Sequence, residues 1–317
     1  MRRLRQAGVR GYTLLVESSN GTPRFEHSVA VIGAGKVGQA LAVLLRKAGA
    51  QITAVTARRP EAADAAALAT GGRATTDNVS AARSAAIVLV TVGDDALEMV
   101  VREVADAGGW TPDHLVVHVS GVYGLEPLAP AAGTGAHIAC VHPLQSFANT
   151  RHAVREIPGS VFGVTAGGDA LELARALVHA VGGVPIEVFG EQRALYHAAA
   201  TVASNHLVAL EDMAIDMLVR SGMPHEIARD ALLPLLQGTV ANVRRFGTSQ
   251  ALTGPVARGD TDTIRRHLAA IEELPARYRS AYRDLAAHAA EMALARGDID
   301  ETMAIELRRL LGGERTL

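Results

Sequence analysis

The segment Val31-Ile-Gly-Ala-Gly-Lys-Val-Gly38 constrains the fold of this chain more than any other. A short apolar run comes first, three glycines follow in the spacing G-x-G-x-x-G, and an apolar helical pattern begins at Val37. The first glycine allows a tight strand-to-helix turn, the second lets the backbone approach a pyrophosphate, and the third lets helix and strand pack closely. The pattern predicts a dinucleotide-binding loop; the alternative is a glycine turn without a ligand.

Strand patterns and helix patterns alternate through the first 190 residues. The predicted strands are residues 28–32, 51–57, 74–76, 86–92, 115–120, 136–141, 161–165 and 185–189. The predicted helices between them are residues 36–48, 60–70, 78–85, 96–107 and 169–181. Such alternation is typical of an α/β, Rossmann-like, doubly wound parallel sheet with helices on both faces.

The pattern becomes purely helical after about residue 190. The predicted helices are residues 191–220, 225–246, 260–274, 275–296 and 298–311, with a loop over 247–259 and Asp260 or Thr261 as a cap. The sequence therefore predicts a Rossmann domain over residues 27–190 and an all-α domain over residues 191–317 that serves substrate binding and dimerisation. Residues 1–26 are turn-rich and predicted to form a mobile leader; the alternative is an arm docked on a partner subunit.

Composition excludes several classes of partner. A formal net charge of −2 gives no basis for binding nucleic acid, and no apolar stretch approaches the ~20 residues that span a bilayer. The single cysteine, Cys140, fits a reducing compartment, so a cytoplasmic protein is predicted, with no metal site. The helical domain has long Ala/Leu faces that one sheet edge cannot cover.

The end of the second predicted strand indicates which nicotinamide cofactor is bound. An NAD-type fold carries an acidic residue there, about 20 residues after the glycines, to bind the ribose hydroxyls. In this chain Arg58 and Arg59 occupy that place, and the first carboxylate is Glu61. Because a guanidinium suits a 2′-phosphate, the sequence predicts NADP(H); the alternative is that both arginines are solvated turn residues.

The carboxyl ends of the predicted strands supply further candidate site residues, because open α/β sheets bind ligands at that edge. The fifth strand ends at Ser120, and the sixth is followed by His142 and Gln145, which are candidates for the substrate pocket. His118 is predicted to be structural. The predicted cofactor-binding residues are Gly33, Ala34, Gly35, Lys36, Val37, Gly38, Arg58, Arg59, Thr91, Val92, Gly93 and Ser120.

The start of the long helix after residue 190 holds a second group of polar residues. His197, Thr201 and Ser204 have the spacing of one helix face, with Asn205 beside them, and the intervening residues are mostly alanine. Polar groups flanked by residues too small to fill space suggest a cavity; the alternative is a set of hydrogen-bonded groups within helix packing.

Taken together, these motifs resemble the β-hydroxyacid dehydrogenase superfamily, whose members include 6-phosphogluconate dehydrogenase, pyrroline-5-carboxylate reductase and ketopantoate reductase. The resemblance is greatest to a Rossmann-like branch with a helical domain of unknown function, and it covers about residues 28–290. Its motifs are Val31-Ile-Gly-Ala-Gly-Lys-Val-Gly38, His118-Val-Ser-Gly121, His142-Pro-Leu-Gln-Ser-Phe147, Tyr196-His-Ala-Ala-Ala200 with Ser204-Asn205, and Gly254-Pro-Val-Ala-Arg-Gly-Asp260.

The resemblance implies reduction of a small 2-oxo acid or imine, with ketopantoate as the named candidate. It also implies a homodimer, because related folds pair through the helical domain. Enzymes of the superfamily often use a lysine on this helix, but the chain has only Lys36 and Lys47. His197 is therefore the predicted proton donor and Asn205 orients the substrate oxygen, with Ser120, His142 or Gln145 completing the pocket. Two alternatives are an NADP:deazaflavin oxidoreductase and a non-catalytic NADP(H)-binding sensor, which the missing lysine favours.

Overall fold

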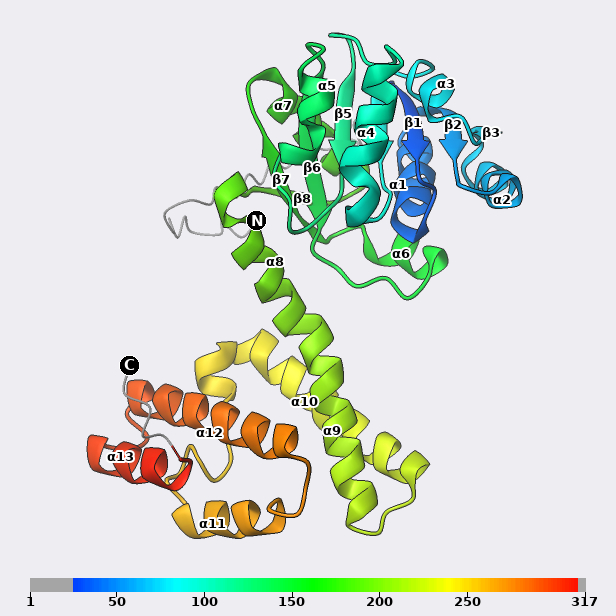
Figure 1. Cartoon of the computed structure of the whole chain (residues 1–317). Coiled ribbons are helices and arrows are strands. Elements are labelled where there is room, and N and C mark those ends of the chain that lie inside the picture. The colour runs from blue at the N-terminus through cyan, green and yellow to red at the C-terminus, as the bar shows by residue number, and fades with distance from the viewer. Residues whose placement is uncertain (1–24, 313–317) are drawn as a thin grey trace. The chain divides into compact units, whose positions relative to one another are not determined.

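The computed structural model describes residues 25–312, which divide into two compact units after Asn205. The first unit is called the Rossmann unit and the second the helical unit (Figure 1). The division lies later in the chain than the predicted change at residue 190, because the helix that follows the sheet packs on the Rossmann unit. The predicted leader lies outside the described residues except for its end, where Phe25 is buried and its N–H bonds to the Ala48 carbonyl.

The Rossmann unit contains an eight-stranded sheet in the order β3-β2-β1-β4-β5-β6-β7-β8. Its strands are β1 (Ser28–Ile32), β2 (Gln51–Thr56), β3 (Arg73–Thr75), β4 (Ile87–Val90), β5 (Leu115–His118), β6 (His137–Pro143), β7 (Val161–Ala166) and β8 (Val184–Glu187). Its α-helices are α1 (Lys36–Lys47), α2 (Pro60–Thr70), α3 (Asn78–Ala82), α4 (Leu97–Asp106), α5 (Ala129–Ala132), α6 (Thr150–Glu156), α7 (Asp169–Ala180) and α8 (Arg193–Thr201).

Both faces of the sheet are covered, as the sequence predicts. Alternate residues of β1 belong to different hydrophobic clusters: Val29 and Val31 pack with α1 and α7, whereas Ala30 and Ile32 pack with α3 and α4. Continuous apolar strands such as β4 are buried along their whole length, which is the pattern expected of central parallel strands. The doubly wound α/β fold is thereby confirmed.

One strand pair departs from the predicted parallel sheet, because β7 runs antiparallel to β6. The Leu144 N–H bonds to the Val161 carbonyl, so β7 begins beside the point where β6 ends. The intervening α6 is short and packs against α1 instead of carrying the chain back across the sheet. The prediction of a wholly parallel sheet is therefore wrong at this pair.

The predicted single helix over residues 191–220 is interrupted by a π-helical turn, Val202–His206, between α8 and α9 (Leu207–Arg220). An extra residue in a helical turn rotates the residues that follow by about 100°, the angle of one residue. The predicted common face of His197 and Ser204 therefore does not follow from spacing alone.

The helical unit comprises α9, α10 (His225–Ala251), α11 (Thr261–Ala270), α12 (Ala276–Arg296) and α13 (Glu301–Leu310). α10 runs through Pro234 and continues past Gly247, whose backbone is not helical, into the predicted loop. The hydrophobic core of this unit is formed around α11, α12 and α13. No helix in residues 25–312 is long and apolar enough to cross a membrane.

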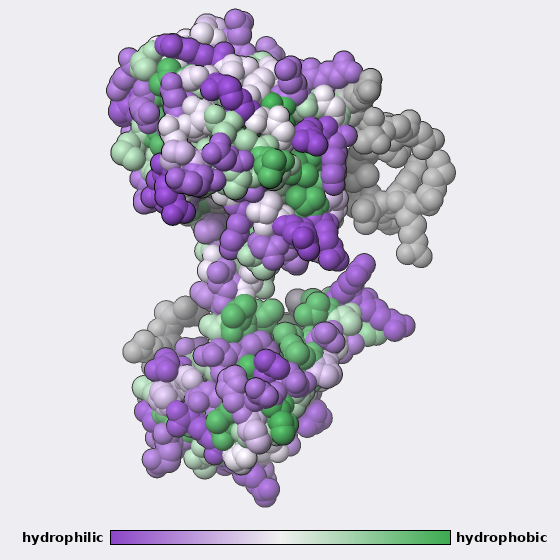
Figure 2. All heavy atoms as spheres, turned by 90° about the vertical axis from the view of Figure 1, so that its right-hand side faces the viewer, coloured by the Kyte–Doolittle hydropathy of each residue, from purple (hydrophilic) through white to green (hydrophobic). Residues whose placement is uncertain are grey.

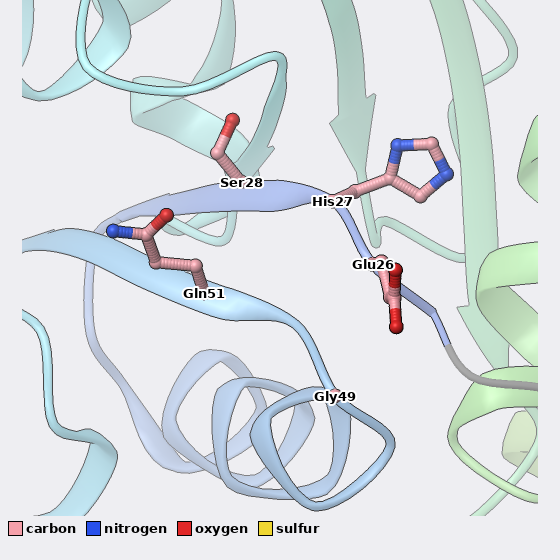
Figure 3. A pocket seen from close by; sticks show the side chains of 5 residues that line it. All are labelled: Glu26, His27, Ser28, Gly49 and Gln51. Atoms are coloured by element: carbon pink, nitrogen blue, oxygen red, sulfur yellow. The ribbon is translucent and has the colours of Figure 1, made fainter.

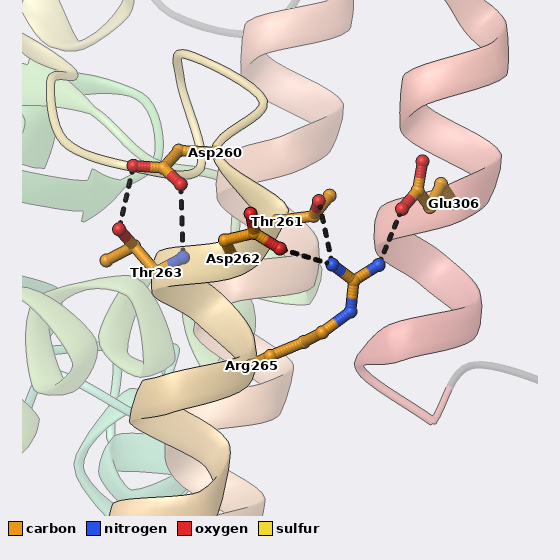
Figure 4. Close-up of polar contacts among 6 residues, drawn as sticks. All are labelled: Asp260, Thr261, Asp262, Thr263, Arg265 and Glu306. Carbon is orange, nitrogen blue, oxygen red and sulfur yellow. Dashed lines mark hydrogen bonds and ion pairs between the residues drawn. The ribbon is translucent and has the colours of Figure 1, made fainter.

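Polar contacts fix the start of α11 in this core (Figure 4). Asp260 accepts hydrogen bonds from the Thr263 N–H at 3.0 Å and from the Thr263 hydroxyl at 2.7 Å, so it is the cap, one of the two predicted candidates. Arg265 bonds Asp262 at 2.8 Å in its own helix and Glu306 of α13 at 2.9 Å. These contacts join α11 to α13.

Candidate functional site

The glycine loop between β1 and α1 has the close packing that its spacing predicts. Gly33 has a φ of 85°, and a Cβ there would lie 2.5 Å from Val92 Cγ1. A Cβ on Gly38 would lie 2.1 Å from Thr91 Oγ1, so α1 could not approach β4 with any other residue. By contrast, a Cβ on Gly35 would meet nothing closer than 4.0 Å, which leaves its backbone open to a ligand.

The amino end of α1 is free to bind an anion. Gly35 is the N-cap and provides no side-chain cap, and the first turn, which begins with Lys36, contains no acidic residue. Two hydrogen bonds fix Ala34: its N–H donates to the Thr56 carbonyl, and its carbonyl accepts from the Gln39 side chain. The first N–H groups of the helix and its positive dipole end fit a pyrophosphate.

Arg58 and Arg59 follow β2 at the same edge of the sheet. Both are exposed, and neither forms an ion pair among the described residues. Sequence reasoning overlooked Thr56 just before them. The Thr56 hydroxyl accepts from the Gly33 N–H at 3.1 Å and donates to Asn78 at 2.8 Å, so it fixes the glycine loop to the second strand.

The remaining predicted cofactor residues lie at the end of β4. The Thr91 hydroxyl donates to the Gly33 carbonyl at 2.6 Å, which ties β4 to the glycine loop. Val92, which is half-buried, and Gly93, which is exposed, come next, before the turn that leads into α4. With Ala34 and Val37 half-buried beside them, the predicted cofactor residues line one edge of the sheet. These residues fit a dinucleotide.

His118, at the end of β5, is a structural residue, as predicted. Its Nε2 donates to the Gly124 carbonyl at 2.6 Å, and its Nδ1 accepts from the Ser120 N–H at 3.1 Å. Burial lowers the pKa of His118 to about 4, and Arg193 adds to that effect. Neutral His118 thus holds the turn that places Ser120.

His142, at the end of β6, contacts two aromatic side chains of α8. Its Nδ1 lies 3.1 Å from the Tyr196 hydroxyl oxygen, and its ring lies nearly perpendicular to that of His197 with centroids 5.8 Å apart. Burial, together with the charge of Arg193, lowers the pKa of His142 from 6.5 to about 3. His142 is therefore neutral near pH 7 and cannot donate a proton as an imidazolium ion.

Two glycines make room for this cluster of rings. A Cβ on Gly121 would lie 2.3 Å from His197 Cδ2 and 2.8 Å from His142 Nε2. A Cβ on Gly163 would lie 2.8 Å from the Tyr196 hydroxyl oxygen. Three strands and α8 therefore converge at the carboxyl edge of the sheet only because both positions lack a side chain.

Arg193, in the first turn of α8, is fully buried, and its guanidinium carbon lies 5.8 Å from the centre of the Tyr196 ring. Its guanidinium donates to the Thr165 hydroxyl at 2.8 Å, the Gly163 carbonyl at 2.8 Å and the Ser120 carbonyl at 3.3 Å. These bonds join α8 to β7 and to the turn after β5. Arg193 and Tyr196 belong to the polar group that the sequence places at the start of this helix, but the sequence analysis gave neither of them a role.

Two predicted catalytic residues lie outside this cluster. The exposed Gln145 donates to the Ser160 hydroxyl at 3.3 Å, and its side chain carbonyl accepts from the Ser146 N–H. Asn205 is exposed in the π-helical turn. His197, His142 and Ser120 are brought together with Tyr196 and Arg193, and we call these five residues the α8 cluster.

A separate pocket opens at the opposite edge of the sheet (Figure 3). Its lining consists of Glu26, His27, Ser28, Gly49 and Gln51, which lie at the starts of β1 and β2. Open α/β sheets bind ligands at the carboxyl ends of their strands, so the α8 cluster and the glycine loop are the better candidate site.

Comparison with known families gives two matches in series. Residues 16–143 match the Rossmann-like domain, and residues 160–289 match the domain of unknown function DUF2520. The chain is therefore similar to a Rossmann-like protein with a DUF2520 region. That second region begins at β7, so it includes α8 as well as helices of the helical unit. No protein of curated function has significant sequence similarity to the chain.

Solved structures resemble the chain over most of its length. A presumed NADP oxidoreductase from Bacteroides fragilis is 25% identical, with 84% of this chain and 98% of that chain covered and a TM-score of 0.69. An imine reductase from Myxococcus stipitatus, in complex with NADP+, is 19% identical, with coverage of 90% and 99% and a TM-score of 0.58. A pyrroline carboxylate reductase from Plasmodium falciparum, with NADP bound, is 16% identical, with coverage of 90% and 100% and a TM-score of 0.56.

Proposed function

We propose that this chain is an NADP(H)-dependent oxidoreductase that reduces a small carbonyl or imine compound. The observation that carries the proposal is the position of the α8 cluster at the same sheet edge as the glycine loop, within one compact unit. A cofactor loop beside groups able to bind and protonate a substrate is what a hydride-transferring enzyme requires. The similarity to reductases with NADP bound supports the same activity.

In this proposal, one set of residues binds the cofactor and another set acts on the substrate. When bound, NADPH supplies a hydride for the substrate carbon. The amino end of α1 would bind the pyrophosphate, and Arg58 with Arg59 would bind the 2′-phosphate. His197 would protonate the substrate heteroatom, since His142 is neutral, while Ser120 and Asn205 would orient that atom. A 2-oxo acid is the proposed substrate type, with ketopantoate as the first candidate to assay.

Cofactor choice is tested by thermal unfolding with NADPH and with NADH. A ligand at 100 times its Kd adds about 2.7 kcal/mol to the free energy of unfolding, so the preferred cofactor gives the larger rise in Tm. Changing both Arg58 and Arg59 to Ala should weaken NADPH binding roughly tenfold or more and leave NADH binding unchanged. Arg102→Ala, an exposed arginine on α4, is the matched control. Equal Tm shifts in the wild type would contradict NADP(H) specificity.

The activity is tested by NADPH oxidation with a panel of 2-oxo acids and cyclic imines, using His197→Ala and Asn205→Ala beside the wild type. Loss of turnover in His197→Ala, with NADPH binding retained, is the expected result. Full activity in both variants would exclude these residues from catalysis. Tight NADPH binding without turnover of any compound would favour a sensor, and reduction of a deazaflavin would favour that class of oxidoreductase.

We also propose that a second copy of the chain covers α10. Of the 27 residues of α10 only Ala228 is buried, and neither α9 nor α10 contributes to the core of the helical unit. Leu233, Val240 and Val243 are 45%, 54% and 39% exposed, and their spacing of seven and three places them on one helix face. Figure 2 shows hydrophobic surface on the helical unit. Self-association would remove this apolar face from water.

A further inference from the structure

The buried charge of Arg193 has no counter-ion among residues 25–312. All three acceptors of its guanidinium are neutral: two carbonyl oxygens and the Thr165 hydroxyl. No carboxylate among the described residues forms an ion pair with it. A buried charge is normally paired, so this unpaired cation needs an explanation.

The charges of two carboxylates act on groups other than His142. Asp94 and Glu126 are exposed, and their charges act on the pKa values of His118 and Cys140. The groups whose charges act on His142 are Arg193, His197 and His118, which are all basic. Among the described residues, the charges that act on His142 are therefore all positive, and no carboxylate is among them.

We propose that the buried charge of Arg193 selects carbonyl substrates over imines. The inference rests on the proposed function and narrows its substrate class. In carbonyl reduction the hydride forms a C–H bond, the π electrons move to oxygen, and the resulting negative charge takes a proton from His197. A cation next to the site stabilises that developing charge.

Imine reduction makes the opposite electrostatic demand. The nitrogen must take its proton before the hydride arrives, so the species that reacts is an iminium cation. In a partly buried site a fixed guanidinium charge repels that cation. A pocket suited to an iminium would carry a carboxylate, and the α8 cluster holds none.

A matched pair of variants at Thr165 tests the charge directly. The Thr165 hydroxyl accepts from Arg193 Nε at 2.8 Å, so Thr165→Asp puts a carboxylate against the guanidinium, while Thr165→Asn has similar size and no charge. The ratio of kcat/KM for 2-oxo acids to kcat/KM for cyclic imines should fall at least about tenfold in Thr165→Asp relative to Thr165→Asn. Arg193→Lys keeps the charge and should keep the wild-type preference.

A second readout is independent of cofactor and turnover. NMR titration of the imidazole protons should show that the pKa of His142, about 3 in the wild type, rises in Thr165→Asp and not in Thr165→Asn. That rise shows that the new carboxylate offsets the charge of Arg193 in a folded protein. An unchanged substrate ratio despite the rise would overturn the inference.

The wild type separates failure of the inference from failure of the proposed function. Reduction of carbonyl compounds in preference to imines supports the inference. Efficient NADPH-dependent reduction of imines, with carbonyl compounds poorly reduced, overturns the selection by Arg193 and leaves the reductase activity standing. Absence of turnover with both classes, although NADPH binds, overturns the proposed function itself and the inference with it.

Discussion

Gly121 shows how a single backbone position sets the geometry of the site. The His142 and His197 rings both meet at its Cα, where a methyl group would lie 2.3 Å from one ring and 2.8 Å from the other. Contacts this short force at least one ring to move. The role of Gly121 could not be predicted from the sequence, because its neighbours come from β6 and α8.

Gly121→Ala should therefore reduce kcat with little change in NADPH binding. A displacement of about 1 Å at reacting groups can lower a rate by roughly 100-fold, so we expect a loss between about tenfold and 100-fold. Steady-state kinetics and the NADPH-induced Tm shift measure the two effects. Gly167→Ala is the control, because a Cβ there meets nothing within 4 Å. Equal activity of both variants would show that the ring positions do not matter for turnover.

The direction of β7 and the π-helical turn after α8 explain how residues of α8 reach the candidate site. The strand β7 runs antiparallel to β6, and β8 runs parallel to β7. The chain enters α8 after these two strands, where Arg193 donates a hydrogen bond to the Gly163 carbonyl of β7. The π-helical turn then changes the register between His197 and Asn205. Such turns often occur at functional sites, which agrees with its place directly after α8.

The exposed face of α10 predicts an oligomer at the level of a single element. Changing both Leu233 and Val240 to Asp should convert a dimer into a monomer, because burying two carboxylates in an apolar contact is unfavourable. Light scattering at micromolar concentration gives the mass. Leu68→Asp, at a 90% exposed position on α2, should leave the mass unchanged. A monomeric wild type would refute the proposed interface.

At the scale of the whole molecule, the two units should respond differently to acid. The pKa values of His118 and His142 are lowered from 6.5 to about 4 and about 3, so below pH 6.5 the unfolded chain binds more protons than the folded unit. The stability of the Rossmann unit is complete above pH 6.5. It falls toward pH 4 by at most about 1.4 kcal/mol per histidine per pH unit. In the helical unit the lowered pKa values belong to carboxyls, Asp216 and Asp260, which respond only below their ordinary 3.8.

Acid titration followed by two probes checks this difference. Trp110 is the only tryptophan, is buried, and lies in the Rossmann unit, so its fluorescence reports that unit alone. We expect the Trp110 transition at higher pH than the loss of helical circular dichroism. His142→Asn removes one of the two titrating groups and should move the Trp110 transition to lower pH. Coincident transitions in the wild type would contradict independent acid responses.

The sequence by itself determined the features that depend on local pattern. Apolar runs and glycine spacing predicted the eight strands, the glycine loop and the helices on both faces except α5 and α6, because the periods of strands and helices can be recognised in neighbouring residues. It also brought out His142 and His197 as candidates, from polar residues at strand ends and on the helix that follows the sheet. It did not reveal that β7 runs backwards, since apolar pattern does not encode strand direction.

Only the tertiary structure decided how the site is assembled. Tyr196 and His142 are 54 positions apart, and Arg193 and Ser120 are 73 positions apart, so no local signal pairs them. The same assembly makes His142 neutral and gives Arg193 no counter-ion in the part of the chain that the structure describes, because burial and charge depend on which elements converge. The sequence thus set the cofactor loop, and the packing of α8 on the sheet set the electrostatics of the proposed substrate site.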